Sequence, residues 1–171
     1  DGAGGDSCSC EGGSDLNTAE WVPAGAMIPD YNGNYPQIQF ATSNFPYEHL
    51  SFDDSTTERA LWQMAWPSAT PQIMQFDCTI FYSAAATGAI DWDIGVRAVG
   101  VGEDLTSAPV ISNVVTDGPS AANRLQASDI TVTVENNQLN PCMLNWQITA
   151  TPATAPFGDM YLVGVYVKIK E

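Results

Sequence analysis

The chain has 171 residues, enough for one domain with a core of its own. Hydrophobic residues make up 44% and charged residues only 15%, which excludes a disordered chain. The 20 acidic residues against 5 lysines and arginines give a net charge of −15, so nucleic acid and an anionic membrane surface are excluded as partners.

No stretch holds the ~18 consecutive apolar residues that a membrane-spanning helix needs. The chain begins at Asp1 rather than at Met, so we expect processing or a fragment, and a signal peptide could have been removed.

Residues 1–19 form a polar arm rich in Gly, Ser and Asp, without the periodicity of a helix or strand. We therefore divide the chain into a flexible arm, 1–19, and a β domain, 20–171. Cys8 and Cys10 are too close in sequence for a zinc-chelating pair. They either crosslink neighbouring subunits or stay unpaired, and both alternatives remain open.

The first half of the domain predicts short strands. Residues 37–42 form one, with Ile38 and Phe40 turned inward, and residues 48–52 form a short strand or coil. Residues 59–66 alternate like a strand, although a short helix is the competing prediction.

Two longer segments, 73–82 and 89–100, alternate apolar and polar residues and predict an antiparallel hairpin. In the second segment Trp92 faces inward, whereas Asp91, Asp93 and Arg97 face outward.

The second half predicts four more strands, at 109–116, 128–135, 142–150 and 160–170. In the third of these Trp146 faces inward, with Asn145, Gln147 and Thr149 opposite. In the last strand one face is expected to hold Tyr161, Val163, Val165, Val167 and Ile169.

Eight to nine strands with one apolar face each indicate an all-β, antiparallel fold of two sheets stacked roughly 10 Å apart. A jelly roll and an immunoglobulin-like sandwich both fit this pattern. Long loops and the lack of a Cys–Trp–Cys framework favour the jelly roll.

The residues offer no catalytic constellation. His49 is the single histidine and is expected to be a surface or hydrogen-bonded structural residue. Asp91 and Asp93 could form a glycosidase pair, but outward strand carboxylates are common without catalysis. A calcium site at Asp53, Asp54 and Glu58 is the minor alternative to a solvated loop. We therefore predict a non-enzymatic protein without cofactor or metal.

Two cysteines lie on inward positions of predicted strands. Cys78 and Cys142 could form a disulfide between strands, or they could be two buried free thiols, which we slightly favour.

Aromatic and apolar residues outside the predicted core suggest a subunit interface. Trp21, Tyr31, Tyr35 and Tyr47 stand in less regular segments. Leu61, Phe81 and Tyr161 are the apolar positions that a neighbouring copy would cover.

Four stretches carry a resemblance to a known group. They are Trp-Val-Pro-Ala-Gly-Ala-Met at 21–27, Phe-Asp-Asp-Ser-Thr-Thr-Glu at 52–58, Ile-Asp-Trp-Asp-Ile at 90–94 and Pro-Phe-Gly-Asp at 156–159 before the Val-rich end. Together they resemble small structural proteins of tailed phages and prophages. The arm with Cys8 and Cys10 departs from that pattern, as does the missing charged insertion before the last strand.

This resemblance implies a jelly-roll-like domain on the virion surface, as a decoration, fibre or adhesin subunit that is often trimeric. Two further hypotheses remain. One is an extracellular filament subunit that assembles by strand exchange into a polymer. The other is a carbohydrate-binding module that contacts a surface glycan through exposed aromatic residues.

Overall fold

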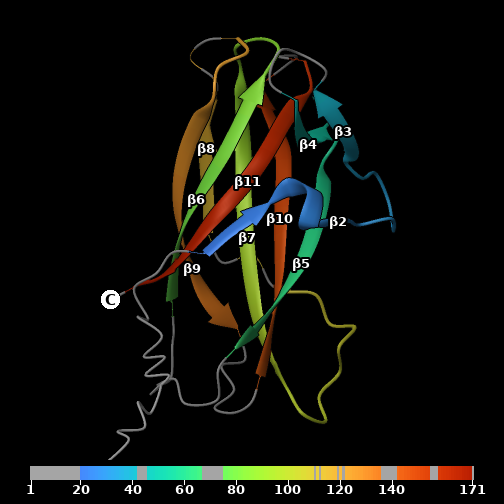
Figure 1. Ribbon diagram of the computed structural model, residues 1–171, viewed down its shortest axis with the longest axis vertical. Helices are drawn as coiled ribbons and strands as arrows, with labels where there is room; N and C mark the ends of the chain where they lie inside the picture. Colours follow the sequence, from blue (N-terminus) through green and yellow to red (C-terminus); the bar gives the residue numbers. More distant parts are fainter. Residues whose placement is uncertain are drawn as a thin grey trace, which may run out of the picture.

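The computed structural model describes residues 20–41, 46–66, 75–109, 111, 113–118, 120, 122–135, 142–154 and 158–170. These residues form two β-sheets that pack face to face, which confirms the all-β, jelly-roll-type sandwich (Figure 1). The described part holds eleven strands rather than eight or nine, because short edge strands add to those that the alternation predicts. The 1–19 arm, with Cys8 and Cys10, lies outside the described residues. Within these ranges, no helix is long and apolar enough to cross a membrane.

Sheet A follows the order β3–β4–β11–β6–β9, and β1 pairs with the second half of β11. Its strands are β1 (Glu20–Pro23), β3 (Gln37–Ala41), β4 (Tyr47–Phe52), β6 (Gln75–Ala84), β9 (Gln126–Glu135) and β11 (Met160–Ile169). A single 3₁₀ turn, η1 (Ala24–Ala26), follows β1.

Sheet B follows the order β2–β5–β10–β7–β8. Its strands are β2 (Ile28–Pro29), β5 (Glu58–Trp66), β7 (Ala89–Gly100), β8 (Asn113–Asp117) and β10 (Cys142–Thr154). A short parallel pairing of β7 with the end of β9 joins the two sheets along one side.

The core lies between the sheets and is rich in aromatic rings. Trp92 of sheet B is fully buried and contacts Phe52 and Tyr82 of sheet A, with ring centroids 5.7 and 5.4 Å apart. Trp146 stacks on its cross-strand neighbour Trp62 at 5.4 Å. The three tryptophans therefore occupy the inward positions that the alternation predicts; the side chain of Trp66 lies outside the described set.

The predicted hairpin of consecutive long strands is wrong. Strand β6 pairs with β9 and β11 in sheet A, whereas β7 pairs with β8 and β10 in sheet B. The connection between them crosses from one sheet to the other, as Greek-key connections in a sandwich do.

Two predicted facings are also wrong. Ile38 and Phe40 are 44% and 68% exposed, because β3 lies at the edge of sheet A. In β11 the register shifts between Leu162 and Gly164, so Met160 and Leu162 point inward before the shift and Val165 after it. A β-bulge adds one residue to one strand and reverses the inward parity beyond it.

Cys78 is a buried free thiol, in line with the second of the two alternatives for Cys78 and Cys142. Burial and the neighbouring Asp77 charge raise the pKa of this thiol far above its usual range. Strand β10 begins at Cys142, whose side chain lies outside the described set.

Candidate functional site

The outer face of sheet B carries a row of polar side chains along β10. Asn145, Gln147 and Thr149 face outward because Trp146 and Ile148, which alternate with them, fill the core. Even so, the three polar residues are only 8%, 5% and 6% exposed. Residues of the neighbouring strands and loops therefore shield this face from water.

The strands on either side of β10 add polar groups in register. Each outward residue of β10 has one neighbour on β7 and one on β5. These rows are Arg97–Asn145–Gln63, Gly95–Gln147–Leu61 and Asp93–Thr149–Arg59.

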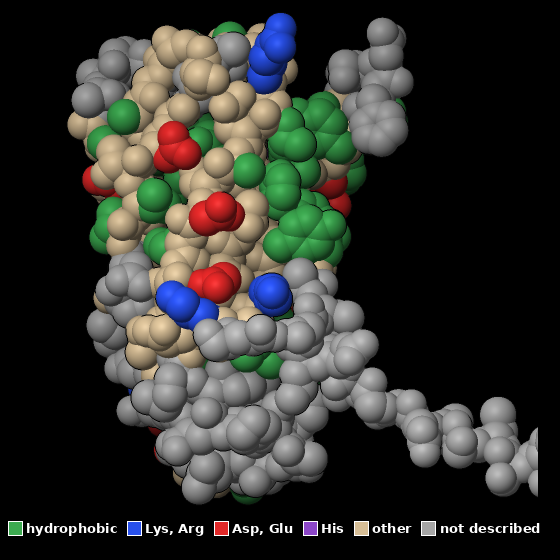
Figure 2. Space-filling view, turned by 90° about the vertical axis from the view of Figure 1, so that its left-hand side faces the viewer, with side chains coloured by type: hydrophobic (Ala, Val, Ile, Leu, Met, Phe, Trp, Pro, Cys, Tyr) green, Lys and Arg blue, Asp and Glu red, His purple; other side chains and the backbone are tan. Residues whose placement is uncertain are grey.

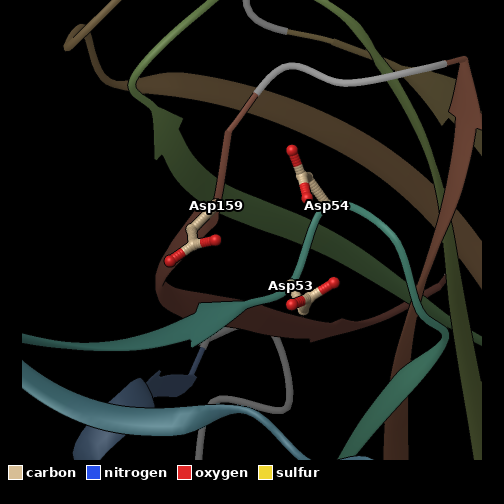
Figure 3. A group of neighbouring side chains, drawn as sticks. All are labelled: Asp53, Asp54 and Asp159. Atoms are coloured by element: carbon tan, nitrogen blue, oxygen red, sulfur yellow. The ribbon is translucent and has the colours of Figure 1, made fainter.

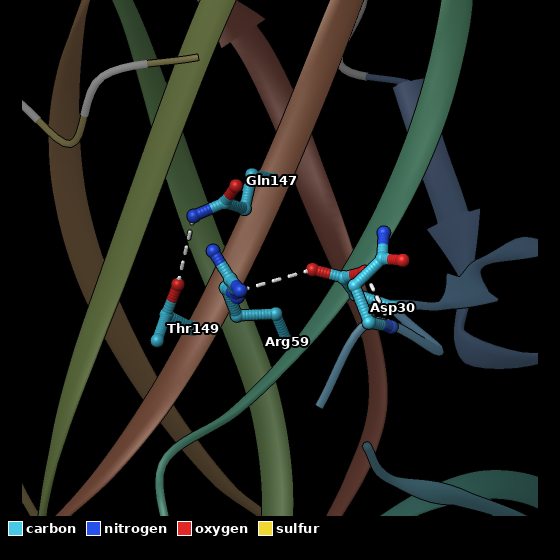
Figure 4. A network of polar contacts seen from close by, with 5 residues as sticks. Asp30, Arg59, Gln147 and Thr149 are labelled. Carbon is cyan, nitrogen blue, oxygen red and sulfur yellow. Dashed lines mark hydrogen bonds and ion pairs between the residues drawn. The ribbon is translucent and has the colours of Figure 1, made fainter. Parts of the chain in front are cut away.

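The segment after β2 forms one wall of the site (Figure 4). Asp30 accepts a hydrogen bond from the Asn32 backbone N–H at 3.1 Å, a local turn that Asp and Asn favour. Its other carboxylate oxygen pairs with the Arg59 guanidinium at 3.2 Å. The Asp30 N–H also donates to the Arg59 carbonyl at 2.9 Å. This wall is thus fixed to β5 by both backbone and side chain.

The segment after β7 forms the opposite wall. Gly102, with φ of 92°, provides the left-handed turn in which this segment leaves the strand. The Asp104 carboxylate accepts the Thr106 backbone N–H at 2.8 Å and the Thr106 hydroxyl at 2.7 Å. These two hydrogen bonds lower the pKa of Asp104 and fix the start of the wall.

Between the two walls lies a cavity of about 200 Å³, which we call the sheet B groove. Its lining residues come from both walls, β5 and β10: Asp30, Asn32, Leu61, Trp62, Gln63, Leu105, Thr106, Ser107, Ala108, Pro109, Asn145, Trp146 and Gln147.

Within the part of the chain that the structure describes, three buried polar atoms on this face have no hydrogen-bond partner: Oδ1 of Asn145, which lines the groove, and Oδ1 of Asp93 and Nε of Arg97, which do not. Buried polar groups are nearly always hydrogen-bonded, so such a concentration on one face is unusual. Two of these atoms accept a hydrogen bond when the aspartate is ionised, and one donates. The arrangement suits a ligand whose groups both donate and accept.

A second group of polar residues lies at the end of β4. Asp53, Asp54 and Asp159 bring carboxylate oxygens within 4.8 Å of one another and could hold a metal ion (Figure 3). Asp54 accepts the Gly158 N–H at 3.1 Å, and Asp159 accepts the Ser51 hydroxyl at 3.1 Å. Asp53 accepts both the N–H and the hydroxyl of Ser55, which lowers its pKa. These contacts hold the carboxylates in place without an ion.

Glu58, the third member of the predicted calcium set, is not in that cluster. It is buried and accepts the Asp53 backbone N–H at 2.8 Å. Burial, with smaller contributions from the charges of Asp53 and Asp159, raises the pKa of Glu58. The predicted trio is therefore corrected: Asp159 takes the place of Glu58, because Glu58 bonds to the backbone of its own loop.

Two of the predicted interface residues meet on the outer face of sheet A. Trp21 lies 5.8 Å from Phe81 and 5.0 Å from Tyr166, measured between ring centroids. With Leu125 and Val163 these rings line an open apolar hollow of about 340 Å³. Figure 2 shows hydrophobic side chains gathered at this side, beside a band of polar ones. We call this set the sheet A aromatic patch.

Of the other predicted interface residues, Tyr47 and Tyr161 also lie on the outer face of sheet A, whereas Tyr31, Tyr35 and Leu61 do not. Tyr31 and Tyr35 contact each other at 4.7 Å between β2 and β3. Leu61 is half-buried in the sheet B groove. Tyr47 and Tyr161 pack on either side of His49, at 5.4 and 4.8 Å. The seven residues therefore do not form one surface.

His49 is not a surface residue. Its side chain is 5% exposed and packs against those two tyrosine rings. Burial lowers the pKa of His49, so the imidazole is neutral at pH 7.

Sequence reasoning placed Asp91 and Asp93 on the outer face but missed the groove beside them. The signal lay in β10, where Asn145, Gln147 and Thr149 are uncharged hydrogen-bonding residues on an outward face. A strand face in contact with water usually carries charged side chains as well, so a face with uncharged polar residues alone indicates that the face is covered.

Comparison with known proteins shows the fold alone. No family model matches the chain, and no curated protein sequence matches it. Among solved structures, the CBM36-1 domain of a xylanase from the hindgut metagenome of Trinervitermes trinervoides matches with a TM-score of 0.52 and 10% identity. That match covers 90% of this chain and 99% of the domain.

Two larger enzymes contain a similar region. The exo-β-1,3-galactanase of Phanerochaete chrysosporium, solved with β-1,3-galactotriose, matches with a TM-score of 0.52, 8% identity and 88% of this chain. The CBM22-1–GH10 part of Clostridium thermocellum xylanase 10B, complexed with xylohexaose, matches with a TM-score of 0.51, 11% identity and 88% of this chain. This chain spans only 29% and 27% of those two chains. The shared fold is a β-sandwich also found in carbohydrate-binding modules.

Proposed function

We propose that this chain is a non-enzymatic carbohydrate-binding protein that holds a neutral glycan in the sheet B groove. The observation that carries the proposal is a set of buried polar atoms that have no partner among the described residues: one on Asn145, which lines the groove, and one each on Asp93 and Arg97, which lie beside it on the same face. A sugar hydroxyl both donates and accepts a hydrogen bond, so one kind of ligand group can satisfy all three.

The comparisons support the same proposal. A carbohydrate-binding domain of nearly the same extent has this fold, and the xylanase with a CBM22 module was solved with a bound xylohexaose. The groove, at about 200 Å³, lies below the roughly 300–1,000 Å³ of drug-sized ligand sites. It would therefore enclose a short part of a glycan, and the rest would extend along the face. We include an extracellular location in this proposal.

The test is a screen of neutral oligosaccharides, including xylohexaose and β-1,3-galactotriose, followed by isothermal titration calorimetry. Gln147→Ala should weaken binding about tenfold, because it removes a buried hydrogen-bonding group from the groove. Gln39→Ala, at an exposed position of β3, is the matched control and should bind as the wild type does. Failure to bind any glycan would refute the proposal.

A second candidate function is a self-assembling subunit of a virion surface, as the sequence resemblance implies. The sheet A aromatic patch favours it, because Trp21 and Tyr166 remain 41% and 42% exposed in the single chain. Native mass spectrometry tests this candidate. A closed trimer supports it, an open polymer supports the filament alternative, and a monomer contradicts both. The patch and the groove lie on opposite sheets, so one protein can use both.

A further inference from the structure

Asp91 and Asp93 share the outer face of β7 but differ in their hydrogen bonding. Asp91 Oδ1 accepts a hydrogen bond from the Thr116 hydroxyl on β8. Asp93 sits opposite Val114 on that side, which offers no polar group, and its Oδ1 atom is buried without a partner. Asp93 thus lacks the hydrogen bond from β8 that Asp91 accepts.

The row across β10 offers a second polar group. Thr149 lies opposite Asp93, and its Oγ1 atom accepts a hydrogen bond from Gln147 Nε2 at 3.1 Å (Figure 4). The hydroxyl hydrogen of Thr149 therefore remains able to donate. A ligand hydroxyl between these two residues would donate to Asp93 and accept from Thr149, next to the Gln147 side of the groove.

No positive charge nearby neutralises Asp93. Arg59, at the other end of its row beyond Thr149, already pairs with Asp30 at 3.2 Å. Arg97 lies four residues along the same strand, about 13 Å away at the rise of a β-strand. The closest charge on its own face is the like charge of Asp91.

We propose that Asp93, which lies beside the sheet B groove on the same outer face, is the carboxylate that contacts the bound glycan and makes glycan binding pH-dependent, strong when it is ionised and weak when it is protonated. This inference rests on the proposed carbohydrate-binding function. A hydrogen bond to a carboxylate is roughly twice as strong as one between neutral groups. A glycan hydroxyl therefore binds the ionised form better and is released as Asp93 gains a proton.

The expected pH range is mildly acidic. Burial, and to a lesser degree the Asp91 charge, raise the pKa of Asp93 to about 6. At pH 5 only about one tenth of the molecules would carry the ionised form, so the apparent affinity should fall about tenfold from its value at pH 7.5.

The experiment is isothermal titration calorimetry of the full chain at pH 7.5 and pH 5.0, with the best-binding neutral oligosaccharide from a screen that includes xylohexaose. The wild type should lose about tenfold in affinity between the two pH values. Asp93→Asn should bind about tenfold more weakly at pH 7.5 and show no pH dependence. The control is Asp129→Asn on the outer face of sheet A, which should keep the wild-type profile.

The outcomes separate the two proposals. If a glycan binds equally at both pH values, or if Asp93→Asn keeps the wild-type profile, the Asp93 inference is wrong and carbohydrate binding stands. If no glycan binds at either pH, the proposed function fails and this inference fails with it. Carboxyl NMR of the free chain gives a readout independent of binding, because the Asp93 signal should titrate near pH 6. Circular dichroism confirms that both variants are folded.

Discussion

Trp92 connects the two sheets at the level of a single residue. Its side chain is fully buried and contacts Phe52 and Tyr82 of the opposite sheet. Replacing it with alanine leaves a cavity that neighbouring rings fill only in part. We predict that Trp92→Ala lowers the free energy of unfolding by about 3–5 kcal/mol, measured by urea denaturation. Val101→Ala, at a position 89% exposed, should stay within about 0.5 kcal/mol of the wild type.

Whereas Trp92 stabilises the folded chain, the charged form of Asp93 should lower its free energy of unfolding. Its pKa is raised to about 6 in the folded chain, so the folded state prefers the protonated form. The contribution of Asp93 to stability is therefore unfavourable above pH 6 and improves as the pH falls from 6 towards 4. We predict that Asp93→Asn raises the free energy of unfolding at pH 7.5 by about 1 kcal/mol, because water reduces the full effect.

The same denaturation series at pH 4 serves as the control for Asp93→Asn. There the carboxyl is mostly protonated in the folded chain, so the gain should shrink. An equal gain at both pH values would mean that the carboxylate charge is not the cause. A carboxylate that lowers stability beside a groove fits the proposed binding role, in which a glycan hydroxyl would be its partner.

At the scale of elements, strand β1 depends on a glycine in β11. A methyl group at Gly164 would lie 2.4 Å from the Trp21 ring and 2.6 Å from the Val22 carbonyl oxygen. Since both atoms belong to β1, the strand would have to move. We predict that Gly164→Ala destabilises the chain by about 1–3 kcal/mol and changes the Trp21 fluorescence. Gly33→Ala, where a methyl group meets nothing within 4 Å, should lack both effects.

Alternation along the chain predicts which face of a strand is buried, but not which strand lies beside it. Residues around Trp92 and Trp146 alternate so regularly that their inward facing follows from sequence. The same alternation is compatible with any neighbouring strand. It therefore could not show that β6 and β7 lie in different sheets, and the predicted pairing of the two is wrong. The bulge near Gly164 and the exposure of Phe40 arise from tertiary contacts and edge position, which no local pattern encodes.

In the candidate site, too, the sequence predicts which way a side chain faces but not what surrounds it. Asp93 could be placed on an outward face from sequence alone, and so could Asn145. The burial of Asn145 could not, because two segments remote from it in sequence, around Asp30 and Thr106, line the groove with it. These segments reach the same face only after β2 and β7 take their places in sheet B. A binding groove of this kind is a property of topology rather than of any motif.

Net charge decides how the whole molecule responds to salt. The chain carries −15, and the ion pairs among the described residues include Arg59–Asp30 and Lys170–Asp77. Repulsion among carboxylates is stronger in the compact state than in the unfolded chain, and salt screens it over about 10 Å at 0.1 M. We predict that raising NaCl from 20 to 300 mM increases the Tm by about 2–4 °C, measured by scanning calorimetry.

The control for this salt effect is the pH. Near the isoelectric point of about 4.1 the net charge is close to zero, so the same NaCl increase should leave the Tm almost unchanged. The strengthening of apolar burial by salt does not depend on whether carboxylates are ionised. An equal rise in Tm at both pH values would therefore show that salt acts on apolar burial instead of on charge. A fall in Tm at neutral pH would mean that ion pairs outweigh the repulsion. That outcome would contradict our premise that charges lower the stability of this chain and that its core of tryptophans between the two sheets supplies most of it.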